Sequence, residues 1–188
     1  MSFAAIQRIL GILLTLFSVT LLPPLGFALW NDDGAANAFS MAFGVTLSMG
    51  MVIWLPVAHI RREMRLRDGF IVVVMFWTVL TAIGALPFVL ADNPHLTLTD
   101  AVFESVSGLT TTGATVITQL DDLPISILYY RQQLQWLGGM GIIVLAVAVL
   151  PMLGIGGMQL YRAETPGPMK DAKLTPRIPE TAKALWYI

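Results

Sequence analysis

Four long uncharged runs dominate the hydrophobic pattern of this chain. They occupy residues 9–30, 39–58, 69–91 and 132–161, the last around the apolar sequence GIIVLAVAVLPMLGIGG. A helix needs about 20 apolar residues to cross a hydrocarbon core of about 30 Å. The pattern therefore predicts an all-α integral membrane protein with four spans, and we place the fourth at 126–158. Prolines are expected to kink or end these helices where neighbouring groups satisfy the backbone. They are Pro23, Pro24, Pro56, Pro87 and Pro151.

Composition supports a membrane location and excludes several classes of function. Apolar residues make up 56% of the chain and charged residues 12%, with a mean hydropathy of +0.73, whereas a soluble domain carries about 25% charged residues. The net charge of −1 argues neither for nor against nucleic-acid binding, but the lack of a basic stripe with interleaved aromatic residues argues against it. The chain has no cysteine, and we find neither a nucleophile–base pair nor a cluster of metal ligands. We therefore predict no enzyme and no organic cofactor.

The distribution of charge predicts the orientation of the spans. All of the eleven basic residues except Arg131 lie near the N-terminus, in the loop 59–69 or in the tail after residue 161. By the positive-inside rule, these three regions are cytoplasmic. A cleaved signal peptide in place of the first span would leave the downstream orientation unchanged. The opposite connections carry Asp32, Asp33, Asp92, Asp121 and Asp122.

The segment 92–123 must leave and return at the same face of the membrane, because the third span ends outside and the fourth must begin there. Within this segment, TLTDAVFESVSGL (97–109) predicts a short helix. Thr97 or Thr99 can cap it, and Asp100 in its first turn complements the positive end of the helix dipole. At 1.5 Å per residue, the helix reaches about halfway across the bilayer. We expect Gly108 to close it.

The sequence TTTGAT at 110–115 gathers backbone carbonyls and hydroxyls directly after this helix. It must climb back in a non-helical conformation, and unpaired carbonyls in a bilayer need an aqueous path or a ligand. Carbonyls in a row, with threonine hydroxyls added, replace the water shell of a potassium ion. Gly113 permits an otherwise strained backbone turn, and the negative end of the preceding helix favours a cation. The stretch therefore favours a binding site for K⁺.

Two other interpretations fit parts of this stretch. Gly108, four residues and Gly113 have the spacing of a phosphate-binding loop, but Ala114 stands where such a loop has lysine. No buried strand precedes the stretch either, so we reject nucleotide binding. The remaining alternative is a Thr/Gly turn that closes a re-entrant hairpin without conduction. In that case the chain is a non-conducting, membrane-embedded structural fragment.

The residues of this region resemble a known family. Asp100–Ser107 matches its pore helix, Thr110–Ala114 its filter strand, and QWLGGMGIIVLAVAVLPMLGIGGMQLYRAETPGP (135–168) the span that follows. On these residues, the chain resembles the Trk/Ktr/HKT superfamily of potassium transporters, and within it most closely the TrkH-type subunit of bacterial Trk systems. The resemblance implies potassium uptake by a channel-like fold, in which four pore units in one polypeptide surround a pseudo-fourfold axis.

The resemblance also implies which residues bind the ion. One quarter of a selectivity filter would be formed by Thr110, Thr111, Thr112, Gly113 and Ala114, whose carbonyls and hydroxyls are the ligands. Among them, Thr111 and Thr112 are the expected K⁺ ligands. The supporting residues are Asp100, Glu104 and Gly108. Potassium is the transported ion, and the residues do not distinguish a channel from symport with protons or sodium.

By the same resemblance, the chain has three parts. Residues 1–66 form an N-terminal two-span hairpin, and 67–165 form the first pore unit. That unit consists of a span (69–91), the re-entrant pore helix and filter (97–116) and a second span (126–158). Residues 166–188 form a cytoplasmic linker and the start of a further span, as in the N-terminal part of a longer protein.

The expected setting is the bacterial cell inner membrane, with the N-terminus in the cytoplasm. The resemblance implies that the full-length protein is a homodimer regulated by TrkA, a cytoplasmic nucleotide-binding protein. The basic, proline-rich stretch Pro166–Pro179 lies on the side from which TrkA would bind. A solvated connector between pore units explains this stretch more simply.

Charged residues near the predicted pore have a structural and a functional interpretation. Ionisable groups within a membrane are usually functional, and we expect Glu104 to bond to the backbone behind the filter rather than to lie on the ion path. Arg131, the lone basic residue on the outer side, is expected to snorkel at the interface, and a role at the mouth of the pore is the less favoured alternative. The outer aspartates Asp92, Asp121 and Asp122 either concentrate cations or are ordinary loop charges.

Overall fold

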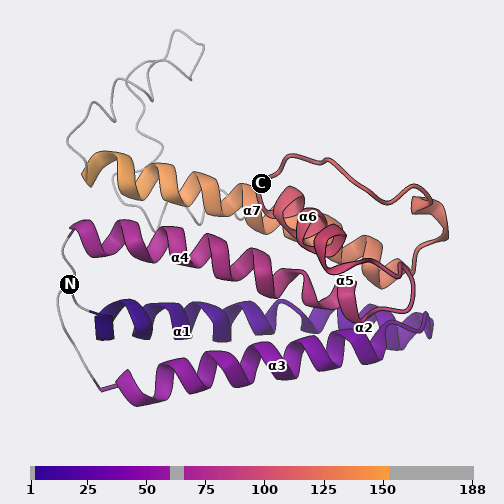
Figure 1. Cartoon of the computed structure of the whole chain (residues 1–188), viewed down its shortest axis with the longest axis horizontal. Coiled ribbons are helices and arrows are strands. Elements are labelled where there is room, and N and C mark those ends of the chain that lie inside the picture. Colours follow the sequence, from indigo (N-terminus) through magenta and orange to yellow (C-terminus); the bar gives the residue numbers. More distant parts are fainter. Residues whose placement is uncertain (1–2, 60–65, 153–188) are drawn as a thin grey trace, which may run out of the picture. The chain divides into compact units, whose positions relative to one another are not determined.

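The computed structural model describes residues 3–59 and 66–152, and regular structure in these residues is helical (Figure 1). The helices are α1 (Phe3–Val19), α2 (Leu22–Asn31), α3 (Ala36–Trp54), η1 (Leu55–Val57), α4 (Leu66–Gly84), α5 (Leu86–Leu90), α6 (Leu98–Leu109), η2 (Leu120–Asp122) and α7 (Ile125–Met152). The chain divides into two compact units, Met1–Trp136 and Leu137–Ile188. The contacts that build the site lie within the first unit. The predicted linker, 166–188, lies outside the described residues.

Three helical stretches among the described residues are long and apolar enough to cross a membrane. They are Phe3–Asn31, Ala36–Val57 and Ile71–Leu90. Each coincides with a span that the sequence predicts, which confirms those three. The predicted fourth span coincides with α7 as far as Met152, and its last residues lie outside the described part. Within the first unit, α1 packs against both α3 and α4 (Figure 1).

Prolines interrupt these stretches, as the sequence predicts. A break separates α1 from α2 just before Pro23, and another separates α4 from α5 just before Pro87. The C-terminal end of α3 tightens into the 3-10 turn η1 at Pro56. Because proline has no backbone N–H, carbonyls in the preceding turn lose their helical donor. Each break therefore needs a hydrogen-bond donor from elsewhere.

Polar side chains of other helices donate to carbonyls at or close to these breaks. Gln133 Nε2 donates to the Thr20 carbonyl at 2.7 Å, Tyr130 OH to the Gly84 carbonyl at 2.9 Å, and Gln7 Nε2 to the Ile53 carbonyl at 3.0 Å. The Thr20 carbonyl is the one whose helical donor would be the missing N–H of Pro24. Carbonyls left unpaired in hydrocarbon are strongly destabilising, so Tyr130 and Gln133 tie the start of α7 to two breaks.

Glycines allow α1 and α3 to approach each other closely. A Cβ added to Gly11 would lie 2.7 Å from the Trp54 backbone nitrogen, and a Cβ on Gly50 would lie 2.7 Å from Thr15 Oγ1. Any larger residue at these two positions would push the helices apart. Within this hairpin, the sequence therefore specifies a close helix crossing through small residues.

A buried aromatic cluster joins the hairpin to the rest of the first unit. Tyr130 of α7 packs against Phe39 of α3 and Phe88 of α5, with ring centroids 5.5 Å and 5.3 Å away. All three side chains are fully buried. The start of α7 is thereby fixed in the core of the unit, beside the segment that carries the candidate site.

Candidate functional site

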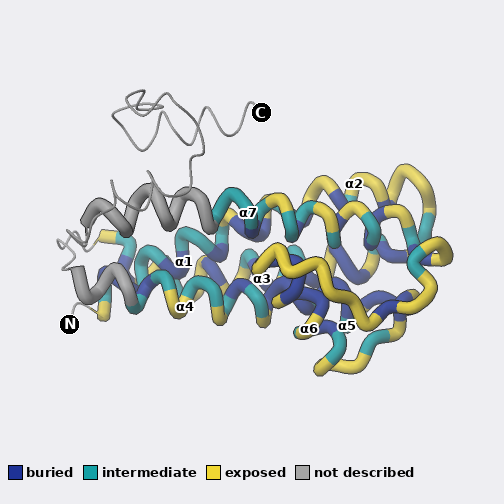
Figure 2. Tube along the Cα trace, turned by 90° about the horizontal axis from the view of Figure 1, so that it is seen from above, coloured by how far each residue is buried: buried dark blue, intermediate teal, exposed yellow. Residues whose placement is uncertain are grey.

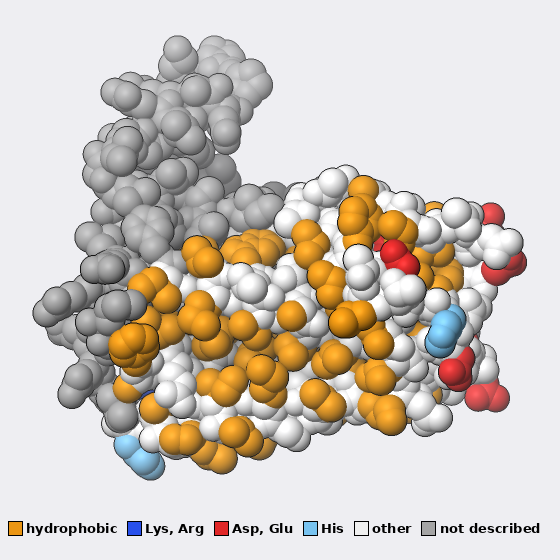
Figure 3. Space-filling view, in the orientation of Figure 1, with side chains coloured by type: hydrophobic (Ala, Val, Ile, Leu, Met, Phe, Trp, Pro, Cys, Tyr) orange, Lys and Arg blue, Asp and Glu red, His pale blue; other side chains and the backbone are white. Residues whose placement is uncertain are grey.

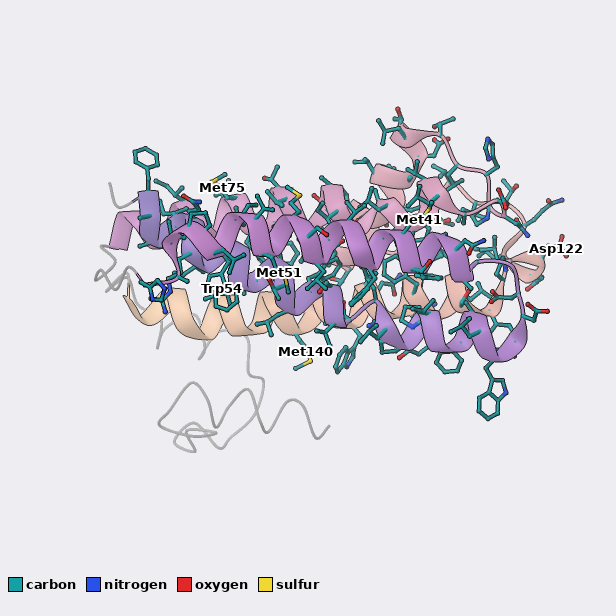
Figure 4. All side chains as sticks on the ribbon, turned by 90° about the horizontal axis from the view of Figure 1, so that it is seen from below. Met41, Met51, Trp54, Met75, Asp122 and Met140 are labelled. Atoms are coloured by element: carbon teal, nitrogen blue, oxygen red, sulfur yellow. The ribbon has the colours of Figure 1, made fainter. Side chains whose placement is uncertain are left out.

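The segment between α5 and α7 leaves and returns at one end of the helices. Asn93 Nδ2 donates to the Asp122 carbonyl at 3.0 Å, which joins the start of the segment to its end. Nearby, Asp33 Oδ2 accepts a hydrogen bond from the Ser126 N–H at 2.9 Å. Acidic side chains gather at this end of the molecule (Figure 3), where Asp122 lies (Figure 4). The two ends of residues 92–123 therefore lie together, whereas the re-entry of this segment into the membrane and its location outside the cell stay predictions.

The short helix α6 begins with a side-chain cap. Thr97 has an extended backbone, and its Oγ1 accepts a hydrogen bond from the Asp100 N–H at 3.3 Å. The same hydroxyl donates to Asp100 Oδ2 at 2.7 Å. The predicted cap is therefore confirmed and is Thr97 rather than Thr99. Asp100 lies in the first turn, where its charge complements the helix dipole.

The end of α6 differs slightly from the prediction. We expected Gly108 to close the helix, but helical structure continues to Leu109 and Thr110 is the cap residue. Gly108 instead lies in the last turn against α7, where an added Cβ would be 3.0 Å from Leu134 Cβ. The glycine thus serves close packing between α6 and α7. With twelve residues, the helix is about 18 Å long at 1.5 Å per residue.

Residues 110–116, the return segment, follow α6 without further helix. All of them are exposed, and they run as one continuous exposed stretch beside α6 (Figure 2). Gly113 has a φ of +73°, so the prediction that this glycine supports an unusual turn is confirmed. Thr111 also has a positive φ, of +56°. This is uncommon for a β-branched residue, and the sequence did not indicate it.

Hydrogen bonds to the last turn of α6 hold the first half of the return segment. The Thr111 N–H donates to the Gly108 carbonyl at 2.9 Å, and the Thr112 N–H donates to the Ser107 carbonyl at 3.0 Å. Ser107 Oγ in turn donates to the Ala114 carbonyl at 2.6 Å. The end of the helix therefore determines both backbone turns. It also engages the carbonyl of Ala114, the last of the predicted ion-binding residues.

Three consecutive carbonyls remain uncommitted. Within the described part of the chain, the oxygens of Thr111, Thr112 and Gly113 accept no hydrogen bond. The hydroxyls of Thr110 and Thr112 lie 2.8 Å apart on the same exposed segment. Carbonyl and hydroxyl oxygens are the ligands that replace the hydration shell of a monovalent cation. The segment thus presents suitable oxygens, although one strand supplies only part of a coordination shell.

Glu104 supports the second half of the return segment from behind. Its Oε1 accepts hydrogen bonds from the Thr115 hydroxyl and, at 2.8 Å, from the Val116 N–H. The Glu104 side chain is 2% exposed. This geometry agrees with the expected bonding of Glu104 to the backbone rather than a position on the exposed surface.

Arg131 is the functional residue that sequence reasoning misplaced. Instead of snorkelling at an interface, its Nε donates to Glu104 Oε2 at 3.1 Å, and its side chain is only 11% exposed. The two residues lie 27 positions apart, on α6 and α7. The charges alone gave a signal, since Arg131 is the sole basic residue on the acidic side of the chain, but only the fold brings it to Glu104.

These features define a multi-pass helical membrane protein with a short helix, α6, between two longer ones and an exposed, carbonyl-bearing return segment. The family model TrkH, described as "Cation transport protein", matches residues 35–188. The chain therefore belongs to the TrkH family, whose members are membrane transporters rather than enzymes.

Individual relatives are similar along the whole chain. The Trk system potassium uptake protein TrkH of Vibrio parahaemolyticus is 63% identical over 188 residues, and that of Escherichia coli is 60% identical. The Escherichia coli protein TrkG is 46% identical over 181 residues. The chain spans 39% of the length of each of these TrkH proteins and 37% of TrkG.

A solved structure shares the fold. The crystal structure of the potassium transporter TrkH from Vibrio parahaemolyticus superimposes with a TM-score of 0.82 at 57% sequence identity. The match covers all of this chain and 36% of that one.

Proposed function

We propose that the protein containing this chain takes up potassium across the bacterial inner membrane, and that the return segment contributes one quarter of its selectivity filter. The row of uncommitted carbonyls at Thr111, Thr112 and Gly113 carries this proposal. The named function of the relatives, potassium uptake, supports the choice of ion. Because the chain spans 39% of their length, the remaining pore units belong to the rest of the protein.

The chemistry of the segment fits a dehydrated potassium ion. Carbonyl dipoles from several strands together replace its water molecules. The segment begins at the C-terminal end of α6, whose partial negative charge attracts a cation. Thr111 and Thr112 supply carbonyls as K⁺ ligands, while the hydroxyls of Thr110 and Thr112 add oxygens at the edge. Ala114 completes the proposed set, and its carbonyl also accepts a hydrogen bond from the Ser107 hydroxyl.

Exposed apolar side chains on α6 support contact with further pore units. Phe103 and Val106 are 44% and 39% exposed, next to the return segment.

We further propose that the full-length protein is a homodimer with its N-terminus in the cytoplasm, and that TrkA regulates it from that side. The stretch Pro166–Pro179, which would face TrkA, lies outside the described residues.

Substitution of Gly113 tests the proposed filter. In the full-length protein, Gly113→Ser places a Cβ on a residue with a φ of +73°, which disfavours that backbone conformation. The carbonyls of Thr112 and Gly113 then tilt away from the ion. We expect the potassium-to-sodium permeability ratio of reconstituted protein to fall about tenfold, which corresponds to about 1.4 kcal/mol. Thr111→Ala, which keeps the carbonyl, should have a milder effect.

Gly44→Ser is the matched control, because Gly44 lies within α3 and no atom lies within 4 Å of an added Cβ. This variant should keep the permeability ratio of the parent protein. An unchanged ratio in Gly113→Ser would contradict the proposed filter. It would favour the alternative that this hairpin is structural and does not conduct.

A further inference from the structure

A buried ion pair connects α7 to the return segment through a single carboxylate. Glu104 directs Oε1 to the Thr115 hydroxyl and the Val116 N–H, and Oε2 to Arg131 Nε. The side chains of Glu104 and Arg131 are 2% and 11% exposed. Within the described part of the chain, Arg131 forms no hydrogen bond or ion pair with the return segment itself and reaches it only through Glu104.

The ion pair is not needed to attach α6 to α7. One turn further along both helices, Gly108 packs directly against Leu134, and Tyr130 anchors α7 to Phe39 and Phe88. The Gly108–Leu134 contact joins the two helices independently of Arg131, and the Tyr130 contacts hold α7 on α3 and α5. The specific effect of the guanidinium is therefore on the carboxylate, whose orientation determines where Thr115 and Val116 are held.

A buried carboxylate depends strongly on its counter-charge. Removing one partner of a buried ion pair leaves an uncompensated charge in a poorly solvated site, whereas replacing both partners is often tolerated. Without Arg131, the Glu104 carboxylate would turn toward water. This change alters the acceptor offered to Thr115 and Val116, so the second half of the return segment loses its support.

We propose that Arg131 is a positioning residue for the return segment, and that it acts through Glu104 to set ion selectivity. The consequence for selectivity rests on the proposed function, whereas the positioning of the segment does not. The inference therefore has two readouts, one structural and one functional. The structural readout remains valid even if residues 110–114 bind no ion.

The structural test uses a cysteine reporter in a cysteine-free version of the full-length protein. Ile117, which directly follows the return segment, is 8% exposed, so Ile117→Cys should react slowly with a water-soluble maleimide. With Arg131→Ala, we expect labelling to become about tenfold faster, because the anchor of Val116 is lost. Ala42→Cys, at a fully buried position in α3, reports on global unfolding and should label at an unchanged rate.

Conservative and paired variants separate positioning from folding. Arg131→Lys keeps the charge and should restore most of the slow labelling, and the double variant Glu104→Gln/Arg131→Gln should label more slowly than Arg131→Ala. Gln132→Ala is the matched control on α7, since Gln132 directly follows Arg131 in the chain and is exposed.

The functional test is the potassium-to-sodium permeability ratio of the same variants. We expect Arg131→Ala to lower this ratio, Arg131→Lys to retain most of it and Gln132→Ala to leave it unchanged. Faster labelling only at Ile117→Cys, together with a lowered ratio, supports the proposal. Unchanged labelling at Ile117→Cys in Arg131→Ala overturns it, as does equal acceleration at Ala42→Cys. An unchanged ratio in Gly113→Ser alone would instead reject the proposed filter and leave the labelling result standing.

Discussion

Gly84 and Ser105 share a small buried space at the break between α4 and α5. A Cβ added to Gly84 would lie 2.6 Å from Ser105 Oγ. That hydroxyl is fully buried and has no hydrogen-bond partner among the described residues. The contact is therefore limited by sterics rather than by bonding, which makes it suitable for a test by paired substitution.

We expect Gly84→Ala to destabilise the full-length protein by about 1–3 kcal/mol, the usual range for overpacking a core. Ser105→Ala alone should have little effect, because the removed hydroxyl has no partner. The double variant should recover most of the lost stability, since the conflicting oxygen is gone. Thermal unfolding in detergent measures all three, with Gly26→Ala as the control at an open position. A double variant as unstable as Gly84→Ala would contradict the described contact.

At the scale of single residues, the sequence predicted local structure where a residue type has one usual structural role, such as threonine at a helix N-terminus or glycine in a tight turn. Thr97 or Thr99 was predicted as the cap of α6 and Gly113 as an unusual turn; Thr97 is the cap and Gly113 has a positive φ. Thr111 was not predicted to have a positive φ, because its conformation follows from its hydrogen bond to Gly108 rather than from its own preference. The pairing of Arg131 with Glu104 likewise depends on how α6 and α7 pack.

At the scale of elements, proline positions predicted where the helices break but not how the breaks are satisfied. The donors come from residues remote in sequence, such as Tyr130, which lies 46 positions from Gly84. The sequence around a tyrosine or glutamine in an apolar run does not indicate which carbonyl its side chain will donate to. The donors on α7 thus give that helix a structural role in two other spans.

Tyr130→Phe should isolate the contribution of one such donor to the stability of the protein. The ring contacts with Phe39 and Phe88 persist, while the buried Gly84 carbonyl loses its hydrogen bond. Leaving a buried acceptor unsatisfied costs about 1–3 kcal/mol, and we expect a loss of stability in this range by thermal unfolding in detergent. Tyr129→Phe is the control, because its ring stacks on Phe27 at a centroid distance of 4.5 Å and is partly exposed. Equal stability of Tyr130→Phe and Tyr129→Phe would show that the Gly84 carbonyl finds another donor.

At the scale of the whole molecule, hydrophobic runs and charge predicted four spans, of which three coincide with helical stretches long and apolar enough to cross a membrane. They also predicted that residues 92–123 return to the face that they leave. These features depend on the average hydropathy and charge of long stretches, not on the contacts of particular side chains. The packing of the hairpin onto α5 and α7 was not predictable, because it depends on individual aromatic and polar contacts across the unit. The sidedness of the molecule remains to be measured.

Cysteine labelling from outside intact cells measures this sidedness. We expect Asp121→Cys to be labelled by a membrane-impermeant maleimide and Arg65→Cys to be protected until the cells are permeabilised, because basic loops are retained in the cytoplasm. Asp121 is exposed and precedes Asp122, which lies at the acidic end of the molecule (Figures 3 and 4), and Arg65 lies outside the described residues. Labelling of Arg65→Cys from outside would reverse the orientation of every span.

The hydrogen bond between Gln133 and the Thr20 carbonyl has a consequence for the order of synthesis. A ribosome makes Thr20 113 residues before Gln133, and Asp33 93 residues before Ser126. During this interval the nascent first span carries an unpaired carbonyl, which must be met by water or by the insertion machinery. The hairpin of α1, α2 and α3 therefore enters the membrane without these two hydrogen bonds, which form only when α7 has been made.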